Sequence, residues 1–402
     1  MLELDVYGTL VAASMVLLLG QFLVTRVGWL SAYTIPEPVA GGLCAALLLL
    51  ALRQWGGVIV HFDSSLSMPL MLAFFACIGL NADLASLRRG GRPLAIFLAV
   101  VIGFLLLQNI TGILLATALG QPPHFGLLAG SIALSGGHGT SVAWGKVFSE
   151  QYGIASATEV ALACATFGLV LGGLVGGPVA KVLLRRVNIP ARDHGAPDGL
   201  TSFEQPHEIR LITAPAMIET LALISICLLA GQALSRALAG SLLELPAFVC
   251  VLFVGVVLRN GLVALGWYAV FERAVSVLGN VSLALFLAMA LMSLRLWELA
   301  ALALPLLGLL FGQTVLVVVY TMFVTFPALG RNYDAAVIAA GHCGFGLGAT
   351  PTAIANMQAV TERFGVAPLA FLVVPMVGAF FIDIVNAIVI KLFLALPWLA
   401  AP

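Results

Sequence analysis

Two glycine-rich stretches contain the side chains of this 402-residue chain that are best suited to binding a small ion or an anion. One reads L-S-G-G-H-G-T-S from Leu134 to Ser141, and the other reads A-A-G-H-C-G-F-G-L-G-A-T-P-T-A-I-A-N-M-Q from Ala339 to Gln358. Both lie between apolar runs, yet their glycines, with Pro351 in the second, interrupt a regular helix. Inside a bilayer such irregular backbone survives only where it is buried in protein or lines a cavity, so each stretch is a candidate binding site.

A helix that is interrupted by a break can bind an ion on either side of the break. Free N–H groups at the start of one arm suit a carboxylate, and free carbonyl groups at the end of the other suit a cation. Neutral hydroxyl, imidazole and amide groups beside the breaks add donors without the cost of burying a charged side chain. Small residues at a break also permit close packing, which is the alternative role for each of them. The predicted substrate-binding residues are Ser135, Gly136, Gly137, His138, Gly139, Thr140, Ser141, Gly346, Gly348, Thr350, Thr352, Asn356 and Asp383.

Each stretch places a histidine directly after a glycine, at His138 and His342, and we take these positions to be equivalent. A single histidine within a membrane usually bonds a backbone carbonyl, whereas the duplication favours a symmetric contact with a ligand. Two histidines do not make a metal site without further cysteine or carboxylate ligands, and we expect no cofactor.

The last apolar run contains F-F-I-D-I-V-N-A, which puts Asp383 and Asn386 on one face of a helix. A carboxylate inside a membrane is costly unless it is paired, so it marks a path for a cation or proton by default. Na⁺, which prefers oxygen ligands, and a substrate ammonium are both suitable partners; a structural hydrogen bond is the alternative. Thr166 lies in the corresponding helix of the first half; if the ion is Na⁺, its predicted ligands are Asp383, Asn386 and Thr166.

The composition is that of a protein that crosses a membrane many times. Hydrophobic residues make up 61% and charged residues 9% of the chain, whereas soluble domains are about a quarter charged. The net charge is zero and there is no basic tail, which excludes a nucleic-acid partner. There is no ATP-binding loop of the form G-x-x-x-x-G-K-[ST], so transport would draw on an ion gradient. An intramembrane enzyme using Ser135 or Ser141 with His138 would lack a third member, so we predict no enzyme.

Windows of about 20 apolar residues predict an all-α polytopic membrane protein with ten crossings. The predicted crossings are 5–26, 35–52, 66–87, 94–119, 155–184, 211–236, 244–266, 275–296, 299–327 and 366–396. The regions 125–150 and 333–363 remain. Each opens apolar, breaks at glycines and closes on polar residues, so we predict a re-entrant hairpin in each.

A polar segment rich in proline, glycine and charge divides the chain into an N-terminal repeat, 1–187, a cytoplasmic linker, 188–210, and a C-terminal repeat, 211–402. The repeats share short matches in the same order, such as A-W-G-K-V-F-S-E-Q-Y-G from Ala143 with A-N-M-Q-A-V-T-E-R-F-G from Ala355. Each repeat holds five crossings, an odd number. The second repeat is therefore predicted to be inverted in the membrane relative to the first.

The arginine and lysine residues predict the orientation. If both termini lie outside, most of these residues, including Arg88, Arg89, Arg185 and Arg186, fall in cytoplasmic loops, as membrane proteins prefer. We therefore predict that both termini are periplasmic and that the hairpins enter from opposite faces. Their breaks would then meet near the middle of the membrane.

Four stretches resemble the bacterial sodium/glutamate symporter family: T-I-P-E-P-V-A-G-G-L from Thr34, the two glycine-rich stretches, and V-V-P-M-V-G-A-F-F-I-D-I-V-N from Val373. The resemblance runs over essentially the whole chain. It implies an inner-membrane carrier that couples L-glutamate uptake to Na⁺, built as a homodimer with a scaffold and a mobile transport domain in each subunit. It also implies that the opposed glycine segments, Gly136-Gly137-His138-Gly139 and Gly341-His342-Cys343-Gly344, line the translocation path.

Two other functions remain open at this point. A Na⁺-coupled carrier of citrate or another di- or tricarboxylate would use the same architecture. An ion channel is also compatible, because opposed re-entrant loops build pores as well.

Overall fold

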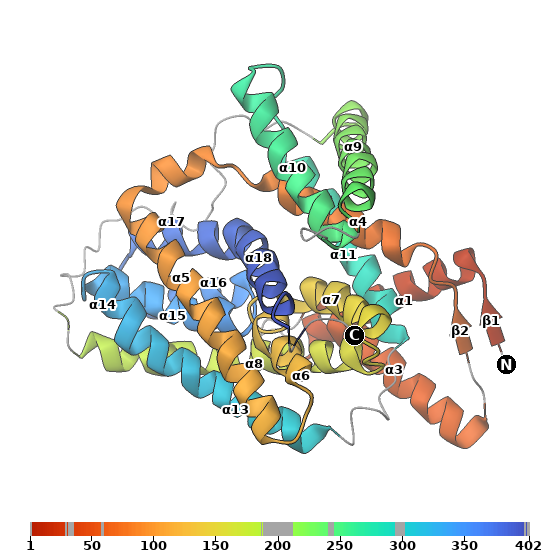
Figure 1. Ribbon diagram of the computed structural model, residues 1–402, viewed down its shortest axis with the longest axis horizontal. Helices are drawn as coiled ribbons and strands as arrows, with labels where there is room; N and C mark the ends of the chain where they lie inside the picture. Colours follow the sequence, from red (N-terminus) through yellow and green to blue (C-terminus); the bar gives the residue numbers. More distant parts are fainter. Residues whose placement is uncertain are drawn as a thin grey trace.

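A computed structural model describes residues 2–28, 30, 36–57, 60–185, 187, 212–239, 245–293, 302–397 and 399 (Figure 1). The predicted linker, 188–210, lies outside the described residues. The described chain is almost entirely helical, apart from two short parallel strands, β1 (Leu2–Leu4) and β2 (Val60–Phe62).

The first half contributes seven α-helices and one π-helical turn among the described residues. They are α1 (Val6–Arg26), α3 (Glu37–Gly56), α4 (Ser67–Asn81), α5 (Ala85–Ala118), α6 (Pro123–Leu127), η1 (Leu128–Ile132), α7 (Gly137–Gln151) and α8 (Ala157–Leu184).

The second half follows the same order of long helices, with two further π-helical turns. Its elements are α9 (Ala214–Leu238), α10 (Ala247–Ala264), α11 (Glu272–Met292), α13 (Ala303–Tyr320), η2 (Thr321–Thr325), α14 (Phe326–Ala328), α15 (Tyr333–Leu347), α16 (Thr350–Phe364), α17 (Pro368–Met376), η3 (Val377–Phe381) and α18 (Ile382–Leu394).

The predicted multi-pass membrane protein is confirmed. Within the described ranges, eight helical stretches are long and apolar enough to cross a membrane. The two other predicted crossings also fall on helices: 66–87 on the shorter α4, and 366–396 on the succession of α17, η3 and α18.

The third predicted crossing is shorter than the sequence indicates, because α4 ends at Asn81 rather than near 87. The side chain of Asn260, on α10, accepts from the Leu84 N–H at 3.0 Å and donates to the Ala82 carbonyl at 2.9 Å. These two bonds satisfy the backbone where the chain leaves the helix. The chain then enters α5, which is kinked at Gly91, where φ is 58°.

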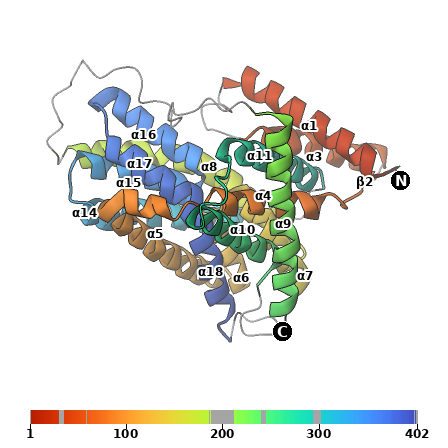
Figure 2. The same ribbon diagram turned by 90° about the horizontal axis from the view of Figure 1, so that it is seen from above.

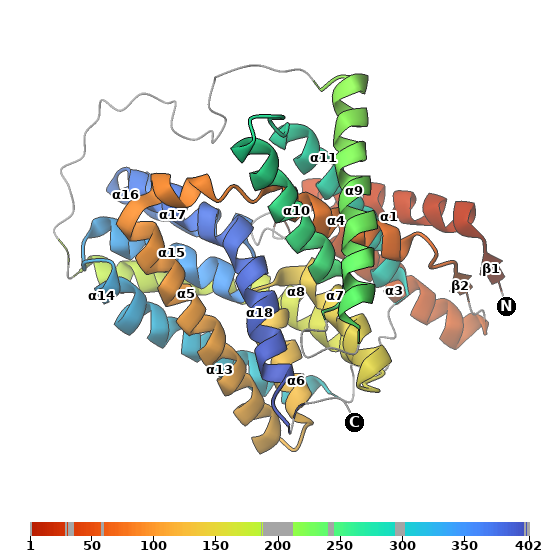
Figure 3. The same ribbon diagram turned by 45° about the horizontal axis from the view of Figure 1, so that its top comes forward.

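The helices form two groups. The six-helix group consists of α1, α3, α4, α9, α10 and α11, which pack on one another, and the hairpin group consists of α5 to α8 and α13 to α18. Figures 1, 2 and 3 all show α14 to α17 at one end of the molecule and α1 and α3 at the other. The groups meet where α7 packs on α11, α18 on α10 and η3 on α4. Each group thus takes corresponding elements from both halves of the chain.

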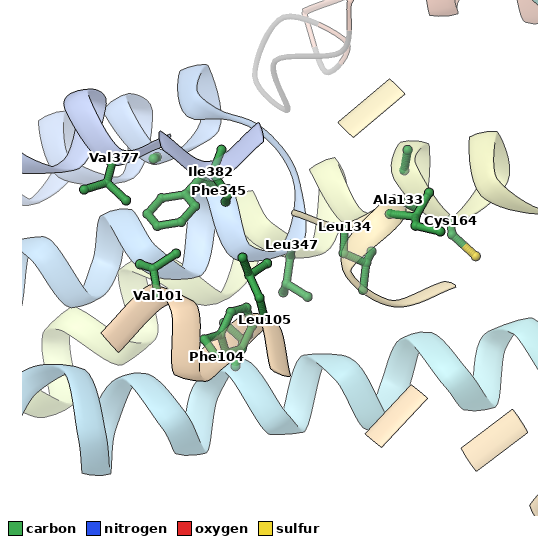
Figure 4. Close-up of a cluster of buried hydrophobic side chains, with 14 of the residues drawn as sticks. Val101, Phe104, Leu105, Ala133, Leu134, Cys164, Phe345, Leu347, Val377 and Ile382 are labelled. Atoms are coloured by element: carbon green, nitrogen blue, oxygen red, sulfur yellow. The ribbon is translucent and has the colours of Figure 1, made fainter. Parts of the chain in front are cut away.

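The core of the hairpin group is apolar and closely packed. Figure 4 shows Phe104 and Leu105 of α5 beside Leu347 of α15, with Leu134 next to them, and all four are essentially inaccessible. Glycines on α8 allow the second hairpin to approach closely. A Cβ at Gly168 would overlap the Leu347 carbonyl, and one at Gly172 would lie 3.0 Å from the Gly344 carbonyl.

Candidate functional site

Two helical hairpins make up the candidate site, and each contains a break between two arms. In the first hairpin, η1 ends at Ile132 and α7 begins at Gly137, so that 133–136 form the break. In the second, α15 ends at Leu347 and α16 begins at Thr350, with Gly348 and Ala349 between them. Gly137 has φ of 69°, a conformation that favours glycine.

The structure brings the two breaks together. A Cβ at Gly137 would lie only 3.6 Å from the Gly348 carbonyl oxygen. The Ser135 hydroxyl lies 3.4 Å from the Gly346 carbonyl oxygen. Residues more than 200 positions apart in the sequence therefore meet at one place in the hairpin group.

A buried glutamine on α5 links the two breaks. Gln108 accepts a hydrogen bond from the Ser135 hydroxyl at 2.7 Å, and its amide nitrogen donates to the Gly346 carbonyl at 2.9 Å. The site residues predicted from the sequence did not include Gln108. The sequence did contain a signal for this residue, because the segment G-F-L-L-L-Q from Gly103 is repeated in the second half as G-L-L-F-G-Q from Gly308, and both segments end on a glutamine.

The counterpart glutamine meets the first one. The side chain of Gln313, on α13, donates to the Gln108 carbonyl at 2.8 Å. Both glutamine side chains are fully buried, and Gln313 Oε1 has no partner among the described residues. The Gln108 side chain thus bonds to both breaks, whereas the Gln313 side chain bonds to the Gln108 main chain, although the two glutamines occupy corresponding positions in the two halves.

The predicted equivalence of His138 and His342 is wrong. His138 lies on α7, after the first break, whereas His342 lies on α15, before the second break. The arms are related by 212 residues, which pairs Ala143 with Ala355 and Gly136 with Gly348. With this offset, His138 corresponds to Thr350 and not to His342. His342 lies five residues before the end of α15, so it is on the arm that precedes the second break.

The two histidines have different surroundings. His138 Nε2 lies 3.1 Å from the hydroxyl of Thr166, which itself donates to the Leu162 carbonyl, so the imidazole is the donor of this pair. His342 Nδ1 lies 2.9 Å from the Thr325 hydroxyl. The His342 ring is fully buried, and the rings around it belong to Phe97, Phe104, Tyr320 and Phe345. His342 is therefore a core residue of the hairpin group and does not face the breaks.

The predicted carboxylate is next to the first hairpin. The Thr140 side chain, on the first turn of α7, lies next to the Asp383 carboxylate on α18. Asp383 is partly exposed, whereas Thr140 is buried. One turn further along α18, Asn386 is fully buried and its amide nitrogen donates to the Ser131 carbonyl at 2.9 Å.

Several other predicted site residues are occupied by contacts within the protein. Ser141 donates to the Gly137 carbonyl at 2.7 Å, and the Asn356 amide donates to the Gly172 carbonyl at 2.9 Å. A Cβ at Gly139 would lie 2.7 Å from the Phe74 ring of α4. Thr352 is buried on the first turn of α16, and Thr350 is partly exposed beside the break.

Both second arms direct their N-termini toward the junction of the breaks. Helices α7 and α16 begin there, and their N-cap residues, Gly136 and Ala349, make no side-chain capping hydrogen bond. A helix N-terminus carries about half a positive charge and unsatisfied N–H groups. Two such termini at one place favour an anion, and an anion with two carboxylates could use both.

Comparison with known sequences identifies the family. A family model described as "Sodium/glutamate symporter" matches residues 2–366. The chain belongs to the sodium/glutamate symporter family. It is 64% identical over 400 residues to a sodium/glutamate symporter of Escherichia coli K12, covering 99% of both chains. It is 52% identical over 392 residues to one of Haemophilus influenzae, covering 97% of both.

Membership of the sodium/glutamate symporter family confirms the resemblance found in the sequence. The relatives are named as symporters, so this is a family of transporters and not of enzymes. With identity this high over the full length, the hairpin geometry described above belongs to a transporter.

Proposed function

We propose that this protein is a secondary active transporter that couples the inward movement of L-glutamate to that of Na⁺. The relatives from Escherichia coli and Haemophilus influenzae bear the name sodium/glutamate symporter. The observation that carries the proposal is the junction of the two breaks, where two uncapped helix N-termini converge. This arrangement suits a small dicarboxylate because it offers two separate sites of positive potential.

In this proposal the substrate binds across the junction. Its carboxylates contact the starts of α7 and α16, with Thr140, Thr350 and Thr352 as neutral donors. The ammonium group is oriented by Asp383, which is partly exposed beside Thr140. A tricarboxylate has no ammonium group, so Asp383 would oppose its binding by charge repulsion. The junction therefore favours glutamate over citrate.

Alternating access follows if the hairpin group moves as a unit against the six-helix group. The Gln108 bonds tie both breaks to α5, which favours movement of the hairpin group as one body. Contacts at the boundary are side-chain contacts that can be exchanged. Lys146, on α7, donates to the Ser67 hydroxyl of α4 at 2.9 Å and lies 5.6 Å from the Phe286 ring centre.

The two halves of the chain are, in the same proposal, inverted repeats in the membrane. The hairpins are re-entrant from opposite faces, and residues 188–210 link the halves in the cytoplasm. Both termini are periplasmic in the bacterial inner membrane, since this places most arginines inside. Two copies form a homodimer, with the six-helix groups as scaffold.

Uptake into proteoliposomes tests this function. The purified protein should accumulate labelled L-glutamate under an inward Na⁺ gradient and not under matched K⁺ or pH gradients. Excess aspartate analogues should compete better than citrate. Accumulation of citrate in preference to glutamate would contradict the substrate, and rapid non-saturable ion flux would indicate a channel.

A further inference from the structure

Among the buried polar atoms that have no hydrogen-bond partner in the part of the chain that the structure describes, three belong to residues that contact one another around the first hairpin arm. They are Asn109 Nδ2 on α5, Ser131 Oγ on η1 and Asn386 Oδ1 on α18. All three residues are fully buried. A buried polar atom without a partner is costly, so a cluster of such atoms indicates a place where a small polar ligand or an ion binds.

The three residues are joined through the main chain of Ser131. The Ser131 N–H donates to Asn109 Oδ1 at 3.1 Å, and the Ser131 carbonyl accepts from Asn386 Nδ2 at 2.9 Å. These bonds fix the orientation of both amides, because a donor must face an acceptor. The atoms left without partners are therefore an amide nitrogen, a hydroxyl and an amide oxygen.

The free hydroxyl of Ser131 is unusual in this molecule. Buried and half-buried hydroxyls elsewhere, such as those of Thr220 and Thr314, donate to the carbonyl four residues earlier in their helix. Ser131 lies in the π-helical turn η1, directly after Gly130, whose φ of −101° and ψ of −130° are not helical. The local break in the helix thus leaves the Ser131 hydroxyl free for another ligand.

The cluster lies next to the proposed substrate site. Asn386 is one turn from Asp383, and Asp383 is partly exposed beside Thr140. A cation attracted by the Asp383 carboxylate could therefore pass along one face of α18 into the buried cluster. Thr166 is less suited as a ligand, because its hydroxyl already faces His138 and the Leu162 carbonyl.

We propose that Ser131 Oγ and Asn386 Oδ1 are ligands of the coupling Na⁺, with Asn109 holding the Ser131 main chain in place. The inference rests on the proposed function. Both ligands are neutral oxygens, which suit Na⁺ and carry no titratable proton, so this site binds a metal cation and not a proton. Asn109 presents an amide nitrogen, a donor, and is a positioning residue.

Ser131→Ala gives a sharp test because it removes a hydroxyl that has no partner among the described residues. A purely structural role therefore predicts no change in stability. We would measure the melting temperature of the full-length protein in lipid nanodiscs against Na⁺, with K⁺ at equal ionic strength, and the Na⁺ dependence of glutamate uptake. The half-saturating Na⁺ concentration should rise about tenfold, as expected when one contact to a charge is lost.

Two further variants complete the experiment. Asn386→Ala removes the second proposed oxygen ligand together with the bond from Nδ2 to the Ser131 carbonyl, so it should also raise the half-saturating Na⁺ concentration. Thr220→Ala, which removes a buried hydroxyl of α9 that donates to the Ala216 carbonyl, should leave it unchanged.

The possible results distinguish a failure of the proposed Na⁺ site from a failure of the proposed transport function. Wild-type Na⁺ dependence in Ser131→Ala would overturn the site while Na⁺-driven uptake by the wild type still supports the function. A stability loss that is the same in Na⁺ and K⁺ would assign the cluster to ordered water and also overturn it. If the wild type shows no Na⁺-driven glutamate uptake, both proposals fail together.

Discussion

Gln108 shows how one side chain can hold two distant parts of a binding site. Both ends of its amide are bonded, one to Ser135 and one to Gly346, in a region from which solvent is excluded. A leucine at this position would leave the Gly346 carbonyl without this donor and the Ser135 hydroxyl without this acceptor. The positions of the two breaks relative to each other therefore depend on this residue.

Replacing Gln108 by Leu should lower the free energy of unfolding by about 1–2 kcal/mol, the upper range for hydrogen bonds within membrane proteins. Glutamate uptake should fall at the same time, because the breaks are no longer tied. Gln313→Leu is the matched control: Gln313 Oε1 has no partner in the described chain, so only the bond from its amide nitrogen is lost. Equal effects of the two variants would contradict the role assigned to Gln108.

Asp383 is the carboxylate that the proposed mechanism depends on most. Asp383→Asn keeps an oxygen that can accept from Thr140 but removes the charge, so the fold should persist. We expect uptake to fall about tenfold or more, since a lost interaction between charges in a low-dielectric site is worth at least about 1.4 kcal/mol. The exposed Glu37→Gln is the control and should transport normally. Unaltered Na⁺-driven uptake by Asp383→Asn would refute the role.

At the scale of elements, the sequence predicted both hairpins but located the second break too early. Gly341, Gly344 and Gly346 suggested interrupted backbone, yet all three lie inside α15. They serve packing: a Cβ at Gly344 would lie 2.5 Å from the Ala353 backbone on the other arm. Glycine lowers helix propensity by about 1 kcal/mol, and close tertiary packing offsets that loss. A single sequence cannot show which glycines break a helix and which admit a neighbour.

Some residues of the candidate site could be predicted from the sequence, whereas their contacts and other residues could not. Asp383 was identified as a candidate because a carboxylate inside a membrane is costly unless it is paired, and Thr140 because it is a neutral donor beside a glycine-rich break. Their contact, and that of Asn386 with Ser131, joins the two halves of the chain and depends on how the helices pack. Ser131 carried no signal, since a lone serine in an apolar helix usually bonds its own backbone.

Helix α8 allows a test of the close approach between elements. Gly168→Ala would place a methyl group against the Leu347 carbonyl, next to the second break, and should lower the melting temperature through a cost of about 1–3 kcal/mol. Gly177 lies on the same helix and is exposed, and a Cβ at this position would have no neighbour within 4 Å among the described residues. Gly177→Ala should therefore be neutral or stabilising. A larger loss from Gly177→Ala than from Gly168→Ala would contradict the packing described for α8.

At the scale of the whole molecule, the division into two helix groups is the feature that transport would use. The long apolar helices could be predicted from hydropathy alone, because apolar length is a local property. Their division into groups could not, since α4 packs on α10 and α11 while α8 packs on α15, all across the two halves. The proposed motion occurs at the boundary between these groups.

Cross-linking across that boundary should stop transport. In a background without the native cysteines, Ser67→Cys with Lys146→Cys, joined by a short bifunctional thiol reagent, would fix α4 to α7, whose native side chains are 2.9 Å apart. We expect uptake to be abolished and then restored when a cleavable reagent is cut.

The control pair lies within the six-helix group. Asn81→Cys with Ser276→Cys joins α4 to α11, where the native side chains are 3.2 Å apart. This cross-link should leave uptake unchanged. Full activity with the Ser67–Lys146 cross-link in place would rule out relative motion at this contact.

The most direct test of coupling is to let glutamate drive Na⁺. Proteoliposomes holding the wild-type protein would be loaded with L-glutamate, with equal Na⁺ on both sides and the membrane potential clamped, and the movement of labelled Na⁺ would be followed. A symporter predicts net Na⁺ efflux that begins with the outward glutamate gradient and ends when that gradient is dissipated. No Na⁺ movement, or Na⁺ flux independent of glutamate, would contradict coupled symport.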